Sequence, residues 1–404
     1  MKKKKDVLLL CQFFYPEYNS SATLPWDTAK HLAEAGFTIG ALCGYPKEYN
    51  AFGKVSDEEK VDNVFIKRIH YLQLRRGKAL ARIINYLSFT VRVILNVKVM
   101  KEYKCVIVYS NPPILPAGAI WANILYKTKI IFVSYDVYPE VAYASNSLKK
   151  NGAIAKAMTS INNSLFKRAD YVVALTNEMK KFLLDKRKNL TADRVRVIPN
   201  WAHESAISVK QNTFERFGYD QQKDFIVSYF GNMGICQDME TILETMEILK
   251  SESHIKFLVV GHGGKMAEVI RRTKALPNVQ VIKFLTGMDF EEVVGISSCG
   301  IVSLEKGLRG MCAPSKYYSY LQRGMPVISI VEKSSYLAKE IARERIGYSV
   351  ENGEAGMLAD DIRELSLNPD ICNKMSQRAQ QLYADKYSKK QSLNQYVDLV
   401  SNLV

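Results

Sequence analysis

The chain has 404 residues, which is too long for one compact hydrophobic core and enough for two domains of ordinary size. Hydrophobic residues make up 47% of the chain and charged residues 24%, which excludes an intrinsically disordered protein. The net charge of +15 is uneven: residues 1–200 carry 32 Lys and Arg against 16 Asp and Glu, whereas residues 201–404 are nearly neutral. Such a charge favours an anionic partner. We expect a membrane surface and no nucleic acid, because no nucleic-acid-binding motif occurs.

Cysteine spacing and apolar runs indicate the compartment. The seven cysteines are widely separated, with no C-x-x-C pair and no cluster with histidine, which predicts a reducing compartment without disulfides or zinc. The apolar run 7–10 is too short for a signal peptide, and no run reaches the ~18–20 residues of a membrane span. We therefore expect a cytoplasmic protein that associates peripherally with the inner face of the plasma membrane.

Short apolar segments alternate with helical patterns through the first half of the chain. Strand Val7–Cys11 leads into the turn-rich stretch 16–21, and a helix is predicted at Pro25–Gly36. Further strands are predicted at 37–43, 64–70, 105–109, 129–133, 171–174 and 195–198. Strands that alternate with helices predict a parallel sheet covered on both faces.

Two segments of this half suggest contacts with ligands. Arg75–Lys104 combines many Lys and Arg with apolar residues, which is typical either of a membrane-surface helix or of a packing helix whose lysines face water. Asp136 follows the strand 129–133 and should lie at the carboxyl edge of the sheet, where ligands bind. The alternative is that Asp136 caps a helix.

The strand–helix pattern restarts after a polar segment at about 201–223, which we interpret as a linker. Strands are predicted at 225–230, 257–260, 279–282, 300–304 and 327–330, and a helix at about Asp238–Leu249. Glycine-rich turns at 231–234 and 261–264 follow the first two of these strands, but neither matches a dinucleotide-binding or P-loop motif. The pattern predicts two doubly wound α/β domains facing across a cleft, with domain 1 at 1–203 and domain 2 at 204–385. Residues 386–404 form a separate C-terminal segment, which resembles the helix that returns to the first domain in the family described below.

The stretch Ala313–Ile328 predicts a helix with a basic start, a stop at Gly324 and a buried strand after it. Ser315 is expected to cap the helix, with Lys316 in its first turn. Free N–H groups and a lysine at a helix start suit a diphosphate, and Arg309 could add a second cation without a metal. The alternative is an ordinary helix-to-strand connection. No D-x-D or H-x-x-x-H spacing calls for a catalytic metal.

Six stretches in this order resemble the large retaining glycosyltransferase family 4, in its bacterial capsule, O-antigen or exopolysaccharide members. They are CQFFYPEYNSSAT, SYDVYPE, VRVIPNW, YFGNMGICQDMETIL, FLVVGHGG and PSKYYSYLQRGMPVI. The resemblance implies the GT-B fold and metal-independent, retaining transfer of a hexosyl or N-acetylhexosaminyl group. The donor would be a nucleoside diphosphate sugar, with UDP as the expected nucleotide and no other cofactor, and the acceptor would be a polyprenyl-diphosphate-linked glycan.

The resemblance also implies roles for individual residues. Asp136, Lys316 and Arg309 would serve the reacting centre, and Ser20 and Ser21, in the loop after the first strand, the diphosphate or the acceptor. The residues expected to hold the donor nucleotide sugar are Gly231, Asn232, Gly234, Gly261, Ser315, Lys316, Tyr317 and Ser319.

The sequence departs from the family pattern at its E-x7-E motif, where Met311 and Ser319 replace the two glutamates. Glu305 or Glu340 could substitute for them, and Asn232 and Gln237 replace the usual Arg/Lys pair of the second domain. An alternative function is therefore a non-catalytic partner or chaperone in a polysaccharide-synthesis complex. A nucleotide-sugar epimerase is less compatible, because no set of paired carboxylates and a histidine can be assembled.

Overall fold

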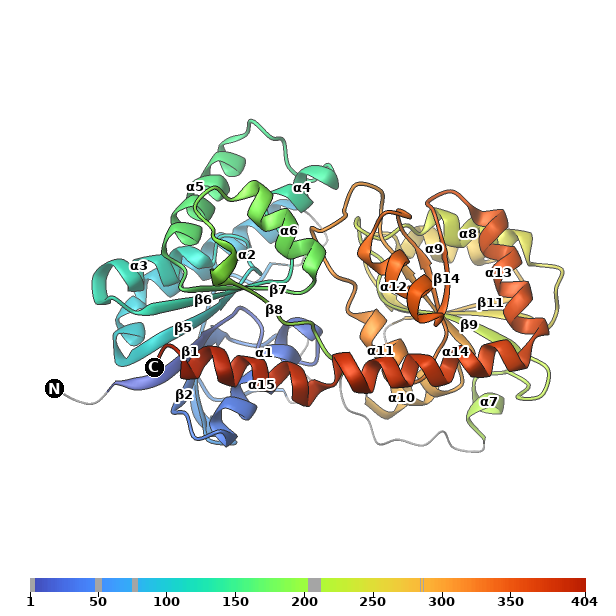
Figure 1. The fold of residues 1–404 in the computed structure, drawn as a ribbon, viewed down its shortest axis with the longest axis horizontal. Coiled ribbons are helices and arrows are strands. Elements are labelled where there is room, and N and C mark those ends of the chain that lie inside the picture. The colour runs from blue at the N-terminus through green and yellow to red at the C-terminus, as the bar shows by residue number, and fades with distance from the viewer. Residues whose placement is uncertain (1–3, 48–52, 75–78, 203–211, 284, 286) are drawn as a thin grey trace. The chain divides into compact units, whose positions relative to one another are not determined.

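The computed structural model describes residues 4–47, 53–74, 79–202, 212–283, 285 and 287–404. The chain forms two compact units (Figure 1). Unit 1 consists of Met1–Asn200, Gly310–Ala313 and Lys390–Val404, and unit 2 of Trp201–Arg309 and Pro314–Lys389. The boundaries predicted at 203/204 and 385/386 thus lie close to 200/201 and 389/390, where the compact units divide. No sequence pattern indicates that 310–313 belongs with unit 1.

Unit 1 is built on an eight-stranded sheet in the order β3-β4-β2-β1-β5-β6-β7-β8. All neighbouring strands are parallel except β3 and β4. The predicted strands are confirmed, as β1 (Lys5–Leu10), β2 (Ile39–Gly44), β4 (Val64–Ile69), β5 (Tyr103–Tyr109), β6 (Lys129–Ser134), β7 (Tyr171–Ala174) and β8 (Val195–Val197). The edge strand β3 (Glu58–Val61) was missed because its residues are largely exposed and polar, so no apolar pattern marks it.

The helices of unit 1 differ from prediction at two places. The first helix, α1 (Ser20–Glu34), begins five residues before Pro25, because the Ala22 and Thr23 amides already donate to the Asn19 carbonyl. The segment predicted as one long helix is α2 (Ala79–Leu95) followed by the 3₁₀ helix η1 (Val97–Glu102). The remaining helical segments are α3 (Pro116–Tyr126), α4 (Glu140–Ala144), α5 (Ala153–Arg168), α6 (Asn177–Lys186) and η2 (Ala192–Arg194).

Unit 2 has a six-stranded, fully parallel sheet in the order β11-β10-β9-β12-β13-β14. The strands are β9 (Phe225–Asn232), β10 (Ile255–His262), β11 (Val279–Lys283), β12 (Cys299–Ser303), β13 (Val327–Ile330) and β14 (Gly347–Val350). The first five are confirmed predictions. β14 was missed because it has only four residues, two of them partly exposed. Two hydrophobic clusters, one containing Tyr320 and the other Ile328, cover the sheet as the parallel arrangement requires.

The helices of unit 2 pack around this sheet, and α8 confirms the helix predicted near Asp238–Leu249. They are α7 (Thr213–Arg216), α8 (Glu240–Ile248), α9 (Met266–Thr273), α10 (Gly287–Gly295), α11 (Lys316–Gln322), α12 (Tyr336–Glu344), α13 (Ala355–Leu367) and α14 (Pro369–Leu382). A π-helical turn, η3 (Tyr383–Tyr387), leads from α14 to α15 (Lys389–Ser401). From Lys390 onward the chain belongs to unit 1, where Asn394 bonds to His31 of α1 at 2.9 Å.

Candidate active site

The glycine-rich turns of unit 2 lie at the carboxyl ends of two neighbouring strands. Gly231 and Gly261 are opposite each other in β9 and β10, and a Cβ on Gly261 would lie 1.9 Å from the Gly231 carbonyl oxygen. Gly261 is therefore required by strand packing, a role that the sequence interpretation did not foresee. Gly231 has a φ of +103°, and a Cβ there would meet only the Lys316 Cε, at 3.9 Å. The left-handed backbone at Gly231 thus lies next to the Lys316 side chain.

Lys316 is the first residue of α11, and its ammonium group is buried without a counter-charge. Its Nζ lies 3.5 Å from the centre of the Tyr229 ring and has no hydrogen-bond partner among the described residues. Burial lowers the pKa of Lys316 from 10.5 to about 7. A ring face stabilises a cation only in part, so this site would gain from an anionic ligand.

Tyrosines hold α11 and the β9 turn in place. The Tyr320 hydroxyl accepts a hydrogen bond from the Phe230 amide at 3.1 Å, and its ring occupies the space that a side chain on Gly300 would need. The Tyr229 hydroxyl donates to the Asn232 carbonyl at 2.9 Å. Both rings are buried. The sequence placed Asn232 in the site but missed Tyr229, which positions Asn232 and Lys316 together.

Other residues of the predicted donor site have different surroundings. Ser315 does not cap α11: its backbone is already helical and its side chain accepts no capping hydrogen bond, so that prediction is wrong. The helix does stop at Gly324, whose φ is +65°. Gly234 donates from its amide to the Gln237 side chain at 2.9 Å, and Ser319 lies half-buried on α11.

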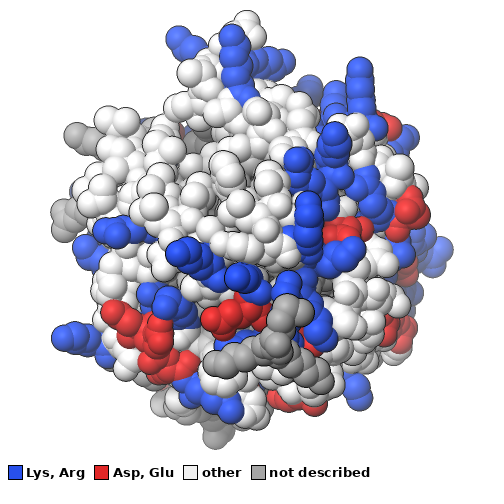
Figure 2. All heavy atoms as spheres, turned by 90° about the vertical axis from the view of Figure 1, so that its left-hand side faces the viewer, with Lys and Arg blue, Asp and Glu red and all other residues white. Residues whose placement is uncertain are grey.

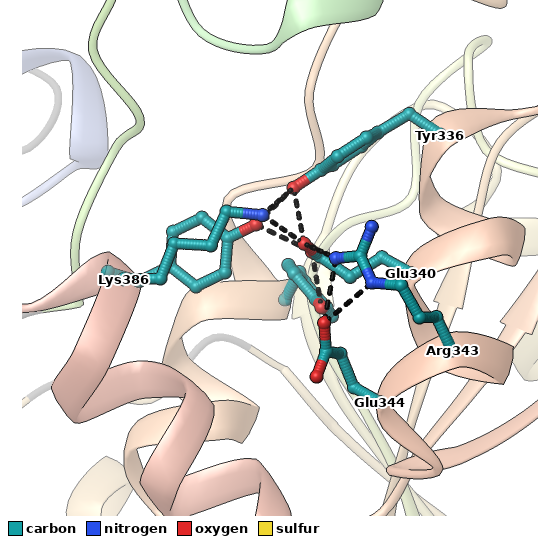
Figure 3. A network of polar contacts seen from close by, with 7 residues as sticks. Tyr336, Glu340, Arg343, Glu344 and Lys386 are labelled. Atoms are coloured by element: carbon teal, nitrogen blue, oxygen red, sulfur yellow. Dashed lines mark hydrogen bonds and ion pairs between the residues drawn. The ribbon is translucent and has the colours of Figure 1, made fainter.

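Tyr317 points into a buried polar network that centres on Glu340, shown in Figure 3. Glu340 is fully buried, and it accepts hydrogen bonds from the hydroxyls of Tyr317 at 2.8 Å, Tyr336 at 2.7 Å and Tyr387 at 2.6 Å. Lys386 pairs with the same carboxylate, and Arg343 lies 3.5 Å from it. With its oxygens occupied, Glu340 is not available to replace a missing donor-site glutamate. Tyr317 has a structural role that the sequence interpretation missed.

Glu305, the other proposed substitute, pairs with Lys265, which the sequence analysis also missed. The Lys265 Nζ lies 2.5 Å from Glu305 Oε1 and 2.6 Å from the Gln237 carbonyl oxygen. Lys265 precedes α9, and Glu305 follows β12, so both lie at the carboxyl edge of the sheet. Lys265 therefore supplies a cation next to Gln237, where the family pattern leads one to expect a basic residue.

Arg309 is exposed and donates to the Ser334 hydroxyl, in the loop after β13, at 2.7 Å. It therefore also belongs to this edge of unit 2. The described residues contain no cluster of three or more His, Cys, Asp or Glu side chains that could hold a metal ion.

In unit 1, Asp136 lies beyond the end of β6 and caps no helix, because α4 begins only at Glu140. Its amide donates to the Ser110 hydroxyl at 3.2 Å, and its backbone forms a bridge with Cys312. Burial raises the pKa of Asp136 to about 6. Ser110, Asn162 and Tyr138 line a small pocket with Asp136. A raised pKa of this kind makes Asp136 a candidate functional residue of unit 1.

Ser20 and Ser21 form the first turn of α1 rather than a loop, so that part of the prediction is wrong. Met311, which replaces the first family glutamate, packs on the core of unit 1, and its carbonyl accepts a hydrogen bond from the Val137 amide at 2.7 Å. Arg75, Arg76 and Lys78 of the predicted basic helix lie outside the described residues. The charged residues of the described helix α2 are Arg82 and Arg92, and both are basic. That Arg75–Lys104 acts as a basic membrane-surface element stays a prediction.

Comparisons with known proteins agree with this architecture. Residues 22–204 match the model of Glycosyltransferase Family 4, and residues 211–382 match that of Glycosyl transferases group 1. "Probable glycosyltransferase WbjE" of Pseudomonas aeruginosa is 23% identical over 248 residues, 59% of this chain and 61% of the relative. "Putative colanic acid biosynthesis glycosyl transferase WcaI" of Escherichia coli K12 is 23% identical over 223 residues, 53% of each chain. The chain thus aligns with little more than half the length of these two relatives.

The fold is shared with solved structures. Anabaena HepE in complex with UDP-glucose superposes with a TM-score of 0.74, at 12% identity, over 99% of this chain and 100% of that one. The predicted fold class is confirmed. The chain has the GT-B fold, and its two halves match the models of Glycosyltransferase Family 4 and of Glycosyl transferases group 1.

Proposed function

We propose that the protein transfers a sugar from a nucleoside diphosphate sugar, with UDP as the nucleotide, to a polyprenyl-diphosphate-linked glycan. The observation that carries this proposal is Lys316, whose buried ammonium group lies beside Gly231 and has no hydrogen-bond partner within the part of the chain that the structure describes. A diphosphate bound there would supply the missing counter-charge, because its oxygens accept charge-assisted hydrogen bonds. The UDP-glucose complex of the structural neighbour HepE supports this choice of donor.

The residues of unit 2 would have different roles in donor binding. Lys316 would stabilise the negative charge that develops on the leaving diphosphate, and Arg309 would add a second, exposed cation. The backbone at Gly231 and Asn232 would approach the donor closely, with Gly234 and Ser319 at its periphery. Tyr317 and Gly261 would act indirectly, by fixing α11 and the strand ends.

Asp136 would serve the reacting centre from unit 1. A carboxyl group with a pKa of about 6 can accept a hydrogen bond from an acceptor hydroxyl and exchange a proton with it. Ser20 and Ser21, in the first turn of α1, would contact a phosphate of donor or acceptor. Retention at the anomeric carbon and metal independence belong to this proposal as well.

The acceptor and the cellular location that we propose are supported by the net charge of residues 1–200 and by the names of the relatives. The excess of Lys and Arg in residues 1–200 suits an anionic membrane on the cytoplasmic side, where a lipid-linked glycan would be met. The name of the relative WcaI points to an exopolysaccharide, and a capsule or O-antigen would present the same chemistry. No helix formed by the described residues is long and apolar enough to cross a bilayer.

The test is a thermal-shift screen with UDP, GDP and dTDP, followed by product analysis with the matching sugar donors. A nucleotide that binds only the folded state raises the melting temperature, and we expect UDP to give the largest shift. NMR of the product then reports whether the anomeric configuration is retained. The proposal fails if no nucleotide binds and no donor is consumed.

A second candidate function is a non-catalytic partner in a polysaccharide-synthesis complex. It is favoured by Met311, whose side chain packs on unit 1 where the family motif has a glutamate, and by the full occupation of Glu340 within its network. Nucleotide binding without any turnover of a complete donor panel would favour this function over catalysis.

A further inference from the structure

The helix α2 exposes large apolar side chains where a surface helix normally carries polar ones. Leu80, Leu87, Val91 and Leu95 follow one another at intervals of seven, four and four residues, which places them on one side of the helix. Between 50% and 71% of each of these residues is exposed. The opposite side, with Phe89 and Val93, is buried in the core. The helix is thus apolar on both sides, unlike an ordinary amphipathic surface helix.

The neighbouring helix α3 adds a second exposed apolar stripe. Trp121, Ile124 and Leu125 occupy positions i, i+3 and i+4, and 42–52% of each is exposed. The two helices are in contact, because a Cβ on Gly118 of α3 would lie 2.6 Å from the Val93 Cγ1 atom of α2. We call these seven side chains the α2–α3 face: Leu80, Leu87, Val91, Leu95, Trp121, Ile124 and Leu125.

Exposed cations lie on or directly beside the elements that form this face. Arg92 lies on α2, Lys98 and Lys101 on η1, and Lys127 directly after α3, and all four are exposed. Arg92, Lys98 and Lys127 form no ion pair with any residue that the structure describes. Figure 2 shows the side of the molecule on which α3 lies: a broad area without charged residues, with many Lys and Arg at its margins.

We infer that the α2–α3 face inserts into the headgroup region of an anionic bilayer, while the surrounding Lys and Arg contact lipid phosphates. Exposed leucines and a tryptophan beside cations are the composition of an interfacial membrane element. A second copy of the chain suits the face less well, because its own cations would oppose those of the first copy.

This inference deepens the proposed function, since a lipid-linked acceptor is met at a bilayer surface. It differs from the membrane contact predicted from the sequence, because apolar insertion through α2 and α3, rather than a basic helix alone, would hold the protein. Vesicle binding is measured without donor or acceptor. It can therefore fail while sugar transfer succeeds, and the reverse also holds.

The experiment uses the full chain with vesicles of phosphatidylcholine and phosphatidylglycerol, compared with phosphatidylcholine alone. The variant Leu87→Ser/Trp121→Ser/Leu125→Ser should bind the anionic vesicles about 100-fold more weakly, since each lost apolar group costs several-fold in partitioning. The matched control Met357→Ser/Leu367→Ser removes two exposed apolar side chains of α13 in unit 2 and should bind like the wild type. Unchanged melting temperatures would show that both variants fold.

A second measurement reports insertion directly. The chain has three tryptophans, and among them Trp121 is strongly exposed, whereas Trp201 is buried. Lipids brominated in their acyl chains should quench the fluorescence of the wild type and leave that of Trp121→Phe unquenched. The inference is overturned if the triple variant binds vesicles as the wild type does, or if acyl-chain bromine does not quench Trp121. It is also overturned if the wild type is a dimer that the triple variant dissociates, because the face would then belong to a second copy.

Discussion

Lys316 and Tyr317 are adjacent in α11 but have opposite environments. The Tyr317 hydroxyl reaches a carboxylate whose oxygens are shared by three tyrosines and a lysine, so every group there has a partner. The Lys316 Nζ is buried with only a ring face beside it. A satisfied network stabilises the fold, whereas an unsatisfied buried cation costs stability unless a ligand compensates it. The contrast distinguishes a structural residue from a candidate ligand-binding residue one position away.

The largest expected effect is a loss of stability when the network around Glu340 is disrupted. Glu340→Ala would leave the hydroxyls of Tyr317 and Tyr387 buried without their acceptor and remove the partner of Lys386. We expect the free energy of unfolding to fall by about 3–5 kcal/mol, measured by urea denaturation. Glu344→Ala, a loss of a more exposed carboxylate in the same helix, should cost less than about 1 kcal/mol. Equal losses for the two variants would contradict the structural role of Glu340.

Replacing Lys316 should change the affinity for nucleotide rather than the stability of the fold. Lys316→Met is expected to weaken UDP binding by about 100-fold, the value of one charge-assisted hydrogen bond. Unfolding stability without nucleotide should stay the same or rise, because an unpaired buried charge is removed. Isothermal titration and urea denaturation measure the two quantities. Lys306→Met, which removes an exposed lysine from the loop after β12, serves as the control and should change neither. A large loss of stability in Lys316→Met would place Lys316 among the structural residues.

The pH dependence separates the two environments further. Burial lowers the pKa of Lys316 from 10.5 to about 7 in the folded protein. Between pH 7 and 10.5, Lys316 is therefore protonated in the unfolded chain and largely neutral in the folded one. Stability without ligand should therefore rise with pH across this window. Affinity for a nucleotide sugar should fall above pH 7, by up to about tenfold per pH unit, because the diphosphate binds the protonated lysine. Titrations between pH 6 and 9 measure this trend. Lys316→Met should show no such slope, and a slope that persists in this variant would assign it to another group.

The smallest effect concerns two serines at helix starts. Ser335 accepts a hydrogen bond from the Ala338 amide at the start of α12, whereas Ser315 makes no capping bond to α11. Ser335→Ala should therefore lower the free energy of unfolding by about 1 kcal/mol, and Ser315→Ala by less than about 0.5 kcal/mol. The same denaturation assay compares them. A greater loss for Ser315→Ala would mean that its hydroxyl contributes to α11 after all.

The sequence predicted the sheets well because their central strands are continuous apolar runs. Tyr171–Ala174 and Val327–Ile330 were placed to the residue, whereas the polar edge strand Glu58–Val61 carries no such signal. The predicted start of α1 at Pro25 is wrong because proline is typical of the first turn of a helix, whereas Pro25 lies inside α1.

The candidate site could be predicted only in part. The pattern around Gly324 correctly indicated a short helix with Lys316 at its start. What surrounds that lysine depends on Tyr229, 87 positions earlier in the chain, which local sequence patterns do not reveal. From the sequence, either Glu340 or Glu305 could replace the missing glutamate of the family motif. In the structure, tyrosine hydroxyls enclose Glu340, and Glu305 pairs with Lys265.

The discontinuity of unit 1 has a consequence for dividing the protein into fragments. Its residues come from three stretches, and the last of them, Lys390–Val404, is synthesised after all of unit 2. A fragment that ends at Asn200 would lack α15 and its contact with His31, so an exchange of unit 2 between relatives must keep the C-terminal helix with the N-terminal half. For the same reason, the last part of unit 1 can assemble during translation only when the ribosome has nearly finished the chain.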